Sequence, residues 1–227
     1  MKQEDISTVD RLLKAVRCVG GIKPEFDSQA NNFKPPQLTV KGTGFWIKGA
    51  NVFVTCAHVV EGFLQRSLEE IGMLTVGGNG EPYRRATVGL IDYMHDLAVL
   101  NVCDSKDAIK TQSDSGLDII SKDPHVATPV AYAGYPFGNQ LLDKDHSPTY
   151  AEGVLGKPIV NLSGPKAIQI SGPSVGGYSG SPVVTKEPVP HIIGVLSNGP
   201  SDRGNTGNVF NAIHWIHLRD AVSLVIG

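Results

Sequence analysis

The sequence predicts an all-β protein of two small barrels, with a short helix near each end of the chain. Three observations lead to this prediction. Short apolar stretches of strand-like pattern recur in both halves and are separated by turns rich in glycine and asparagine. A polar stretch rich in serine and aspartate, residues 104–122, separates the two groups of strands. Apolar residues fall at helical spacing near both termini.

The first barrel is expected at about residues 16–103. A helix should precede it, because a loose capping pattern at Ser7 and Asp10 frames apolar residues at helical spacing, namely Val9, Leu12, Leu13 and Val16. Lys23–Pro36 is polar, contains three prolines and is expected to be a surface loop. Strands are predicted at residues 16–19, 38–40, 45–47, 52–54, 74–76, 86–91 and 97–102, with a helical turn at 58–62.

The second barrel and its helix are expected at about residues 128–227, after an inter-barrel connection at about 104–127. Its strands are predicted at residues 130–133, 150–154, 167–171, 181–185, 191–196 and 209–212. Gly138–Pro148 is a long charged loop. A C-terminal helix over 216–225 should dock on the barrel, because Leu218, Val222 and Val225 lie at helical spacing. The chain, 1–227, is therefore expected to be a single domain of two lobes.

Composition narrows the class of protein. The 227 residues carry 20 lysines and arginines against 22 aspartates and glutamates, with no basic run of the kind that binds nucleic acid. The apolar runs are short of a membrane span, and the acidic start Met1–Asp5 does not resemble a signal peptide. Three widely spaced cysteines do not form a disulfide framework. We therefore expect a cytoplasmic protein that binds neither nucleic acid nor membrane.

The stretch Gly177–Pro182 has the composition of a nucleophile loop, with Ser179 between Gly177 and Gly180. Small residues let the backbone turn sharply enough to present a hydroxyl. They also let a substrate carbonyl approach main-chain N–H groups that can bind an oxyanion. Because a serine hydroxyl is a weak nucleophile at neutral pH, Ser179 needs a base from elsewhere in the chain.

Two earlier stretches offer partners for Ser179. His58 stands in the apolar run Thr55–Val60, and Asp96 opens the apolar run Asp96–Leu100. Taken singly, the three are explained as a buried histidine, a strand-start residue and a turn residue. Together they follow the order His, Asp, Ser at separations of 38 and 83 residues. This order differs from that of subtilisin and the α/β-hydrolases, and it leaves room for the histidine and aspartate on one barrel and the serine on the other.

Six motifs in this order resemble the chymotrypsin-fold, trypsin-like serine peptidases, most closely the HtrA/Deg-like bacterial type. They span most of the chain: Gly42–Phe45, Thr55–Val60, Asp96–Leu100, Gly134–Gly138, Gly177–Pro182 and Gly194–Gly199. The resemblance implies two six-stranded antiparallel Greek-key barrels with short terminal helices. It also implies a serine endopeptidase of a single domain. The PDZ module that often follows in HtrA relatives is not expected, because the sequence stops at Gly227.

The resemblance assigns roles to residues. Ser179 is expected to be the nucleophile, His58 the general base and acid, and Asp96 the group that orients the imidazole. The N–H groups of Gly177 and Ser179 are expected to form the oxyanion hole. Pro173, six residues before the serine, would form the floor of the specificity pocket, and Ser197, Asn198 and Gly199 its facing wall. Neither offers a carboxylate, so we expect cleavage after small or medium apolar side chains of a protein or peptide substrate.

Tyr178 departs from the trypsin branch, in which an aspartate at this position receives a newly cut N-terminus. Tyr178 cannot form that ion pair, so activation would depend on loop ordering near residues 134–153 or 172–175, or on a regulatory protein partner. The alternative to an active peptidase is a catalytically silent binding or scaffold protein of the same fold, and an esterase is a third possibility. No cofactor or metal is expected: His214 and His217 are interpreted as surface histidines, and Cys56 as a small core residue.

Overall fold

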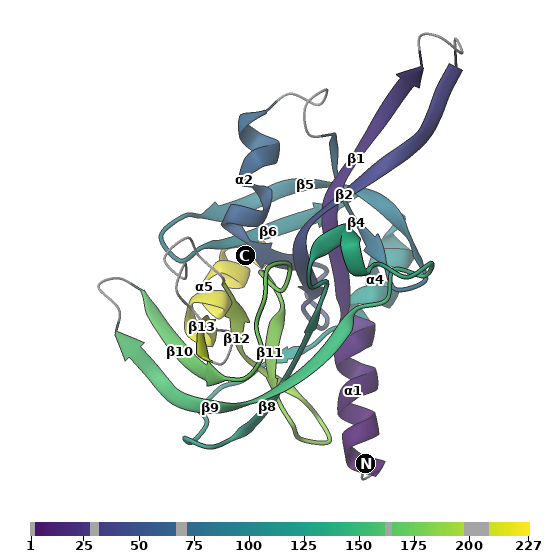
Figure 1. Cartoon of the computed structure of the whole chain (residues 1–227). Coiled ribbons are helices and arrows are strands. Elements are labelled where there is room, and N and C mark those ends of the chain that lie inside the picture. Colours follow the sequence, from purple (N-terminus) through teal and green to yellow (C-terminus); the bar gives the residue numbers. More distant parts are fainter. Residues whose placement is uncertain (1–2, 28–31, 67–71, 162–164, 198–208) are drawn as a thin grey trace.

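The structure, a computed structural model, describes residues 3–27, 32–66, 72–161, 165–197 and 209–227. Strands form two adjoining barrels, and the helices lie at their edges (Figure 1). The prediction of an all-β fold with two six-stranded antiparallel barrels is confirmed. Among the described residues, no helix combines the length and the apolar character that crossing a bilayer requires.

The first barrel closes in the order β1-β2-β3-β6-β5-β4. Its strands are β1 (Val16–Asp27), β2 (Asn32–Trp46), β3 (Phe53–Cys56), β4 (Met73–Gly78), β5 (Glu81–Asp92) and β6 (Leu97–Val102). The α1 helix (Gln3–Ala15) leads directly into β1, and α2 (Ala57–Gln65) follows directly on β3. Because β3 pairs with β2 on one edge and β6 on the other, it is buried along its whole length.

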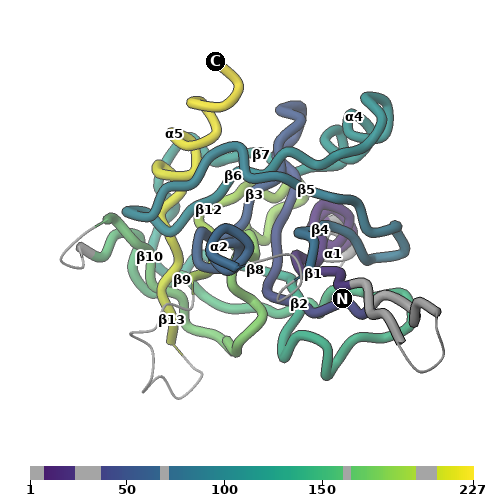
Figure 2. The backbone as a smooth tube through the Cα atoms, turned by 90° about the horizontal axis from the view of Figure 1, so that it is seen from above, coloured from purple at the N-terminus to yellow at the C-terminus, as the bar shows by residue number. Residues whose placement is uncertain are grey.

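The second sheet has the order β11-β8-β9-β10-β13-β12-β7, and the pairing of β11 with β12 closes six of these strands into a barrel. Its strands are β7 (Asp118–Ile119), β8 (Pro129–Gly134), β9 (Thr149–Asn161), β10 (Lys166–Ser171), β11 (Pro182–Thr185), β12 (His191–Leu196) and β13 (Val209–His214). A 3₁₀ helix, η1 (Gly138–Leu141), follows β8. The C-terminal helix α5 (Trp215–Ile226) packs against β5 and β6 of the first barrel (Figure 2).

The buried apolar side chains of the described residues form two clusters. One lies inside the second barrel around Tyr132, Ile168 and Phe210. The larger fills the first barrel and continues across the seam to residues of the second half, including Val195 and Leu218. A core shared in this way fixes the two barrels against each other, so that side chains from both can form one site.

The predicted surface loop at Lys23–Pro36 is wrong for most of its length, because β1 and β2 continue through it as a hairpin that projects from the barrel (Figure 1). β1 pairs with β4 only as far as Ile22 and beyond that pairs with β2 alone. The prolines therefore lie in a two-stranded ribbon, where no third strand needs their missing N–H groups. The pairing also shifts register around Pro24, which removes that residue from the ladder.

The inter-barrel connection contains a helix that the sequence did not predict, α4 (Lys106–Asp114). Ser105 caps it, since its side chain accepts a hydrogen bond from Ala108 N at 3.2 Å. Ser113 is its buried residue, and its Oγ donates to Ile47 O at 3.0 Å. Its apolar residues are only Ala108 and Ile109, too few to mark a helix in the sequence.

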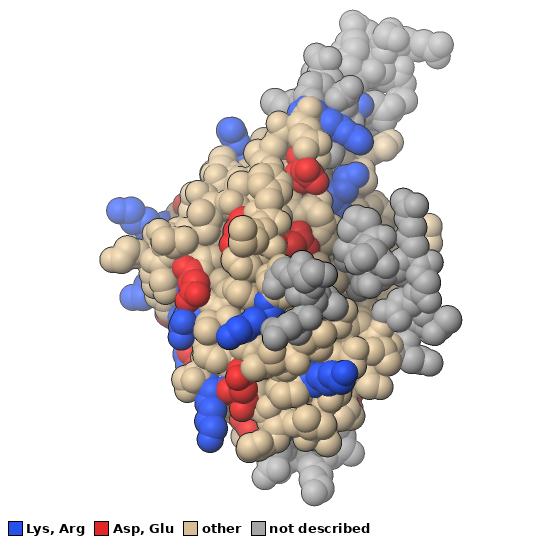
Figure 3. All heavy atoms as spheres, turned by 90° about the vertical axis from the view of Figure 1, so that its left-hand side faces the viewer, with Lys and Arg blue, Asp and Glu red and all other residues tan. Residues whose placement is uncertain are grey.

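Charges of both signs are mixed on the face of the molecule that Figure 3 shows. Figure 3 views the molecule from the left-hand side of Figure 1 and shows lysines and arginines interspersed with aspartates and glutamates. Among the described residues on this face, lysines and arginines do not gather into one broad positive patch.

Candidate active site

The pairing of two strands brings His58 and Asp96 together. β3 runs antiparallel to β6, with Cys56 opposite Leu97. His58 lies in the first turn of α2, just after β3 ends, and Asp96 immediately precedes β6. Two main-chain donors fix the approach: Ala57 N donates to the Asp96 carbonyl at 3.0 Å, and His58 N donates to Asp96 Oδ1 at 3.0 Å.

The imidazole of His58 and the carboxylate of Asp96 form a close pair. His58 Nδ1 lies 2.8 Å from Asp96 Oδ2 and 3.0 Å from Oδ1. Because a carboxylate only accepts hydrogen bonds, Nδ1 carries the hydrogen and Nε2 is left as an acceptor. The side chains of His58 and Asp96 are 33% and 28% exposed, so the pair is open to solvent on one side.

Hydrogen bonds keep Asp96 ionised. Burial on its own raises the pKa of this carboxyl group, because a buried carboxylate loses hydration. The hydrogen bonds from His58 and Ser197, with the charge of His58, outweigh that effect and leave the pKa of Asp96 below its ordinary value. Ser197 Oγ donates to Asp96 Oδ2 at 2.5 Å. This donation from the end of β12 is a contact that the sequence did not predict.

Two glycines shape the loop that carries Ser179. Gly177 and Gly180 have φ values of +101° and +87°, in the left-handed region that favours glycine. A Cβ atom on Gly177 would lie 2.1 Å from Tyr135 O, and one on Gly180 would lie 2.0 Å from Thr43 O. Both the torsion angles and the close backbone approach therefore require glycine here.

Thr43 of β2 holds this loop from the other barrel. Its N–H donates to Ser179 O at 2.8 Å, and its Oγ1 donates to Gly177 O at 2.8 Å. The same Oγ1 accepts a hydrogen bond from Tyr135 N at 3.1 Å. On the opposite side, Gly180 N donates to Leu196 O at 2.8 Å. The nucleophile loop is thus pinned between β2 of the first barrel and β12 of the second.

Ser179 lies next to the segment that carries His58. A Cβ atom built on Gly42 would lie 2.9 Å from Ser179 O and 2.7 Å from Val59 Cγ2. The main chain of Ser179 and the side chain of Val59, the residue after His58, therefore both lie against Gly42. Ser179 is 6% exposed. Among the described residues, the structure has no hydrogen bond between Ser179 Oγ and His58. The predicted His58–Asp96 contact is therefore present, whereas the serine lies nearby with its hydroxyl unbound.

The main-chain N–H groups of the loop divide into two sets. Tyr178 N donates to Val175 O at 3.3 Å, and Ser181 N donates to Tyr178 O at 2.8 Å. In contrast, the N–H groups of Gly177 and Ser179 donate to no group among the described residues. The two donors that the sequence assigned to an oxyanion are thus the ones left open by the loop's own hydrogen bonds.

The residues predicted to bind substrate are partly described. Pro173 is exposed, and its carbonyl accepts a hydrogen bond from the Tyr132 hydroxyl. The Tyr132 ring also packs edge-on against Tyr178, with centroids 5.5 Å apart. Tyr178 is therefore a buried packing residue, 5% exposed. Ser197 is half-buried, whereas Asn198 and Gly199 lie outside the described residues.

Cys56 lies beneath the His58–Asp96 pair. Its Sγ is buried and donates to Leu196 O at 3.2 Å, and burial raises the pKa of the thiol well above its ordinary value. Ligand atoms of Cys56, His58 and Asp96 lie within 4.8 Å of one another, a spacing that a metal ion could bridge. Because imidazole and carboxylate already bind each other and the thiol is protonated, we interpret this group as a hydrogen-bonded pair over a core cysteine.

The interpretation of His214 as a surface residue is wrong, since it is 2% exposed. It caps α5, its Nδ1 accepting a hydrogen bond from Ile216 N at 3.2 Å. Its Nε2 lies 3.0 Å from Asp123 Oδ1. His217 lies one turn further along α5, and its Nε2 accepts a hydrogen bond from Lys166 N at 3.1 Å. One ring nitrogen of each histidine is therefore committed to the main chain.

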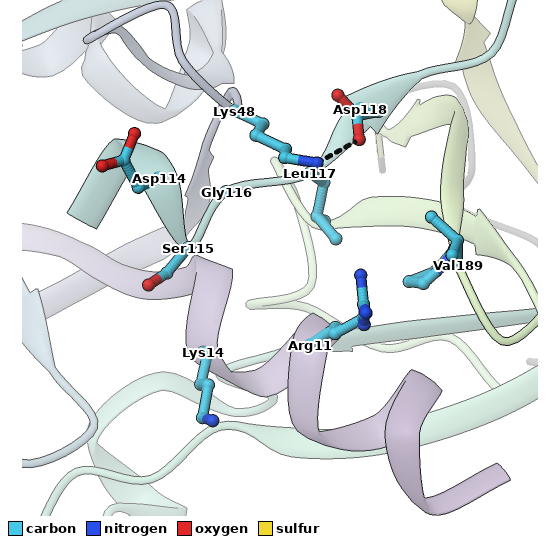
Figure 4. A pocket seen from close by; sticks show the side chains of 10 residues that line it. Arg11, Lys14, Lys48, Asp114, Ser115, Gly116, Leu117, Asp118 and Val189 are labelled. Atoms are coloured by element: carbon cyan, nitrogen blue, oxygen red, sulfur yellow. Dashed lines mark hydrogen bonds and ion pairs between the residues drawn. The ribbon is translucent and has the colours of Figure 1, made fainter. Parts of the chain in front are cut away.

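A pocket of about 200 Å³ lies elsewhere, where α1, the β2–β3 turn, residues 114–118 and residues 189–190 meet. Figure 4 shows Arg11 pointing into it and Lys48 paired with Asp118. The Lys48–Asp118 distance is 3.0 Å. None of the site residues predicted from the sequence lines this pocket, so it is separate from the His58–Asp96 pair.

Comparison with known protein families gives one match over most of the chain. The sequence profile of the Trypsin-like peptidase domain family matches residues 42–194, which include His58, Asp96 and Ser179. No match was found among curated proteins.

Two solved structures of the Rv3671c protease from M. tuberculosis share the fold. The active form has a TM-score of 0.68 and 19% sequence identity, over 96% of this chain and 83% of that one. The inactive form, a serine-to-alanine mutant, has a TM-score of 0.65 and 18% identity, over 96% of this chain and 89% of that one. At such identities the likeness establishes the fold.

Proposed function

The chain belongs to the Trypsin-like peptidase domain family and is a serine peptidase, and on this premise we propose that His58, Asp96 and Ser179 are its catalytic triad. The observation that carries the proposal is the 2.8 Å contact between His58 Nδ1 and Asp96 Oδ2. It fixes the imidazole with Nε2 as the free acceptor beside a serine of the other barrel. The substrate is a protein or peptide, cleaved within the chain.

The proposed reaction uses these groups in two steps. Ser179 Oγ attacks the scissile carbonyl and its proton passes to His58 Nε2, while Asp96 stabilises the imidazolium. The carbonyl oxygen becomes an oxyanion that accepts hydrogen bonds from Gly177 N and Ser179 N. His58 then protonates the leaving amine, and water attacks the acyl-enzyme by the same route in reverse. The Ser179–His58 hydrogen bond is completed when substrate binds, as is common when an unliganded site has this contact long.

A fluorophosphonate probe tests the triad, because it reacts only with an activated serine. We expect the wild-type protein to be labelled and Ser179→Ala to lose labelling, with a fall of about 10⁶-fold in turnover. Ser181→Ala is the matched control, because Ser181 lies in the same loop and its buried Oγ has no hydrogen-bond partner among the described residues. If folded wild type is not labelled, the catalytically silent binding protein becomes the better explanation.

The proposed substrate preference is a small or medium apolar residue at the cleaved bond. Pro173, Ser197, Asn198 and Gly199 would form the pocket and offer no carboxylate to a basic side chain. The segment 197–199 would also pair with the substrate backbone as an added strand. Profiling with a peptide library measures this preference directly, and selection of lysine or arginine would reject it.

Regulation through the loop Gly138–Pro148 is part of the proposal. Phe137 N donates to Gly176 O at 2.7 Å, which joins the residue before this loop to the residue before the nucleophile loop. Further along, Asn79 N donates to His146 O at 2.8 Å, which ties the loop to the first barrel. A protein partner that moves residues 138–148 would therefore act on the Ser179 segment. Full activity after replacing this loop with a short glycine linker would exclude that route.

We also propose a cytoplasmic location. All three cysteines are free: Cys18 and Cys56 are buried, and Cys103 is exposed. Thiols persist in this state in a reducing compartment. Burial raises the pKa of the Cys18 thiol to about 12, so that it is unreactive at neutral pH.

A further inference from the structure

The turn that carries Asp96 is also held by a second group of side chains, centred on His95. His95 immediately precedes Asp96 in this turn between β5 and β6. The ring nitrogen Nδ1 of His95 lies 2.6 Å from Asp92 Oδ2, and the main-chain N–H of His95 donates to Asp92 Oδ1 at 3.1 Å. The side chain of His95 therefore binds Asp92 within the turn, whereas the side chain of the next residue, Asp96, binds His58.

The His95 ring is stacked on a ring from the other half of the molecule. His217 of α5 lies against it with centroids 3.9 Å apart and planes inclined by 22°. His217 Nε2 in turn accepts the hydrogen bond from Lys166 N at the start of β10. A continuous series of contacts thus runs from Asp92 through the two imidazoles to the second barrel, where α5 lies over β5 and β6 (Figure 2).

Asp96 needs such support because its backbone is strained. Its φ is +53°, in the left-handed region, which aspartate tolerates better than most non-glycine residues but still adopts in a minority of cases. A residue in this conformation persists where its surroundings hold it. The stack on His217 lies one residue away, and it anchors the turn to an element outside the first barrel.

The environment keeps His217 neutral, as its role of acceptor requires. Burial lowers the pKa of His217 to about 4, and the neighbouring imidazoles of His95 and His214 act in the same direction. The carboxylates of Asp220 and Asp92 oppose this shift without overcoming it. Burial also lowers the pKa of His214, with Asp123 opposing this shift and Lys166 adding to it. A neutral imidazole at position 217 accepts from Lys166 N and stacks on His95 without charge repulsion.

We propose that His95 and His217 are positioning residues of the peptidase, forming a clamp that holds Asp96 in register with His58 Nδ1. Neither residue contacts Ser179 or the reacting atoms, and both act through the backbone of Asp96. The proposal rests on the proposed triad, and its outcome is nevertheless separable from that of the triad. Because the Asp96 carboxylate must meet Nδ1 within a few tenths of an ångström, loosening the turn acts on the chemical step and leaves substrate binding unchanged.

Two substitutions divide the clamp into its parts. His217→Ala removes both the stack and the acceptor, whereas His217→Phe keeps an aromatic ring on His95 and loses only the acceptor. With a fluorophosphonate probe, we expect His217→Ala to lower kinact by about tenfold with KI unchanged, and His217→Phe to retain most of the wild-type rate. His125→Ala, at an exposed histidine that takes no part in the stack, is the matched control and should match wild type.

Proton NMR gives a readout that does not depend on turnover. The Nδ1–H of His58 resonates far downfield when it is bound to a carboxylate, and this signal should shift or broaden in His217→Ala. A folded His217→Ala protein with wild-type kinact and an unchanged signal overturns the clamp. If His217→Ala does not fold, His95→Asn removes the stack from the other side, and the same two measurements decide. A shifted signal in a protein whose wild type is never labelled supports the clamp and rejects the triad.

Discussion

The two sides of the proposed site differ in how completely the fold arranges them. The Asp96 carboxylate has three donors: His58 N, His58 Nδ1 and Ser197 Oγ. On the nucleophile side, Ser179 Oγ and the N–H groups of Gly177 and Ser179 have no partner among the described residues. The hydrogen bonds of the proposed base are thus already formed in the unliganded protein, whereas the nucleophile and the oxyanion donors remain free to bind the substrate. Such a division is expected of a site complementary to a transition state.

Removing the charge of Asp96 should have the largest effect on this comparison. Asp96→Asn keeps the size of the side chain but presents an NH₂ group or a weaker acceptor to His58 Nδ1. We expect kinact with a fluorophosphonate probe to fall by about 10⁴-fold, because the imidazole is then held in the wrong tautomer. Asp118→Asn is the control, since Asp118 pairs with Lys48 in the separate pocket. Wild-type reactivity of Asp96→Asn would remove Asp96 from the triad.

On the nucleophile side, Gly177→Ala should have the next largest effect. The added Cβ would lie 2.1 Å from Tyr135 O, so the peptide must move and carry the Gly177 N–H away from the oxyanion. The loss of one such donor lowers kcat by about 10²–10³-fold. Gly49→Ala is the matched control: Gly49 also has a positive φ, +69°, but its Cβ would meet nothing within 4 Å. Equal peptidase activity in the two variants would contradict this role.

Ser197→Ala tests the third donor to Asp96 and should act more weakly. Loss of a hydrogen bond of about 1 kcal/mol predicts a fall of about fivefold in kinact. The pKa of Asp96 should also rise, since Ser197 helps to lower it. Because the folded pKa of Asp96 lies below its unfolded value of 3.8, this carboxylate stabilises the fold above pH 3.8 and ceases to do so as the pH falls through the folded pKa. The variant should lose activity and stability at a higher pH than wild type, as acid titrations would measure.

His217→Gln should have the smallest effect, visible in the pH dependence of stability. The unfolded chain binds a proton at His217 near pH 6.5, whereas the folded protein binds it near pH 4. Between these values the unfolded state holds more protons, so the free energy of unfolding decreases as the pH falls from 6.5 to about 4. Urea denaturation across this window should show a shallower decrease in His217→Gln than in His125→Gln. Identical slopes would be evidence against a depressed pKa at His217.

Much of the site could be predicted because its signals are local. His58 and Asp96 each lie beside the end of a strand, and the two strands pair directly, so their contact follows from the order of the elements. The glycines around Ser179 announce a turn by their residue type alone. The catalytic roles of these residues remain proposals. What the fold contributes to them is the contact of His58 with Asp96 and the place of the serine loop between two barrels.

Other features could not be predicted, because they depend on packing between distant parts of the chain. Ser197 meets Asp96 across 101 residues, and His95 meets His217 across the seam between the barrels. No spacing in the sequence marks either contact. The burial of His214 follows from its position at the junction of β13 with α5. The outer part of the β1–β2 hairpin could not be predicted for a different reason. Proline usually indicates the end of a strand, but it is tolerated here because no third strand pairs with this part of the hairpin.

Thr43 makes the shape of the nucleophile loop depend on both barrels. Its hydrogen bonds to Gly177 and Ser179 mean that the serine loop, though encoded with the second barrel, obtains part of its shape from the first. A protein divided within the segment 104–127 would therefore yield two inert fragments, neither with a finished active centre. Catalysis would return only when the fragments reassociate. The rate at which a fluorogenic peptide is hydrolysed would then report how much of the two fragments has associated.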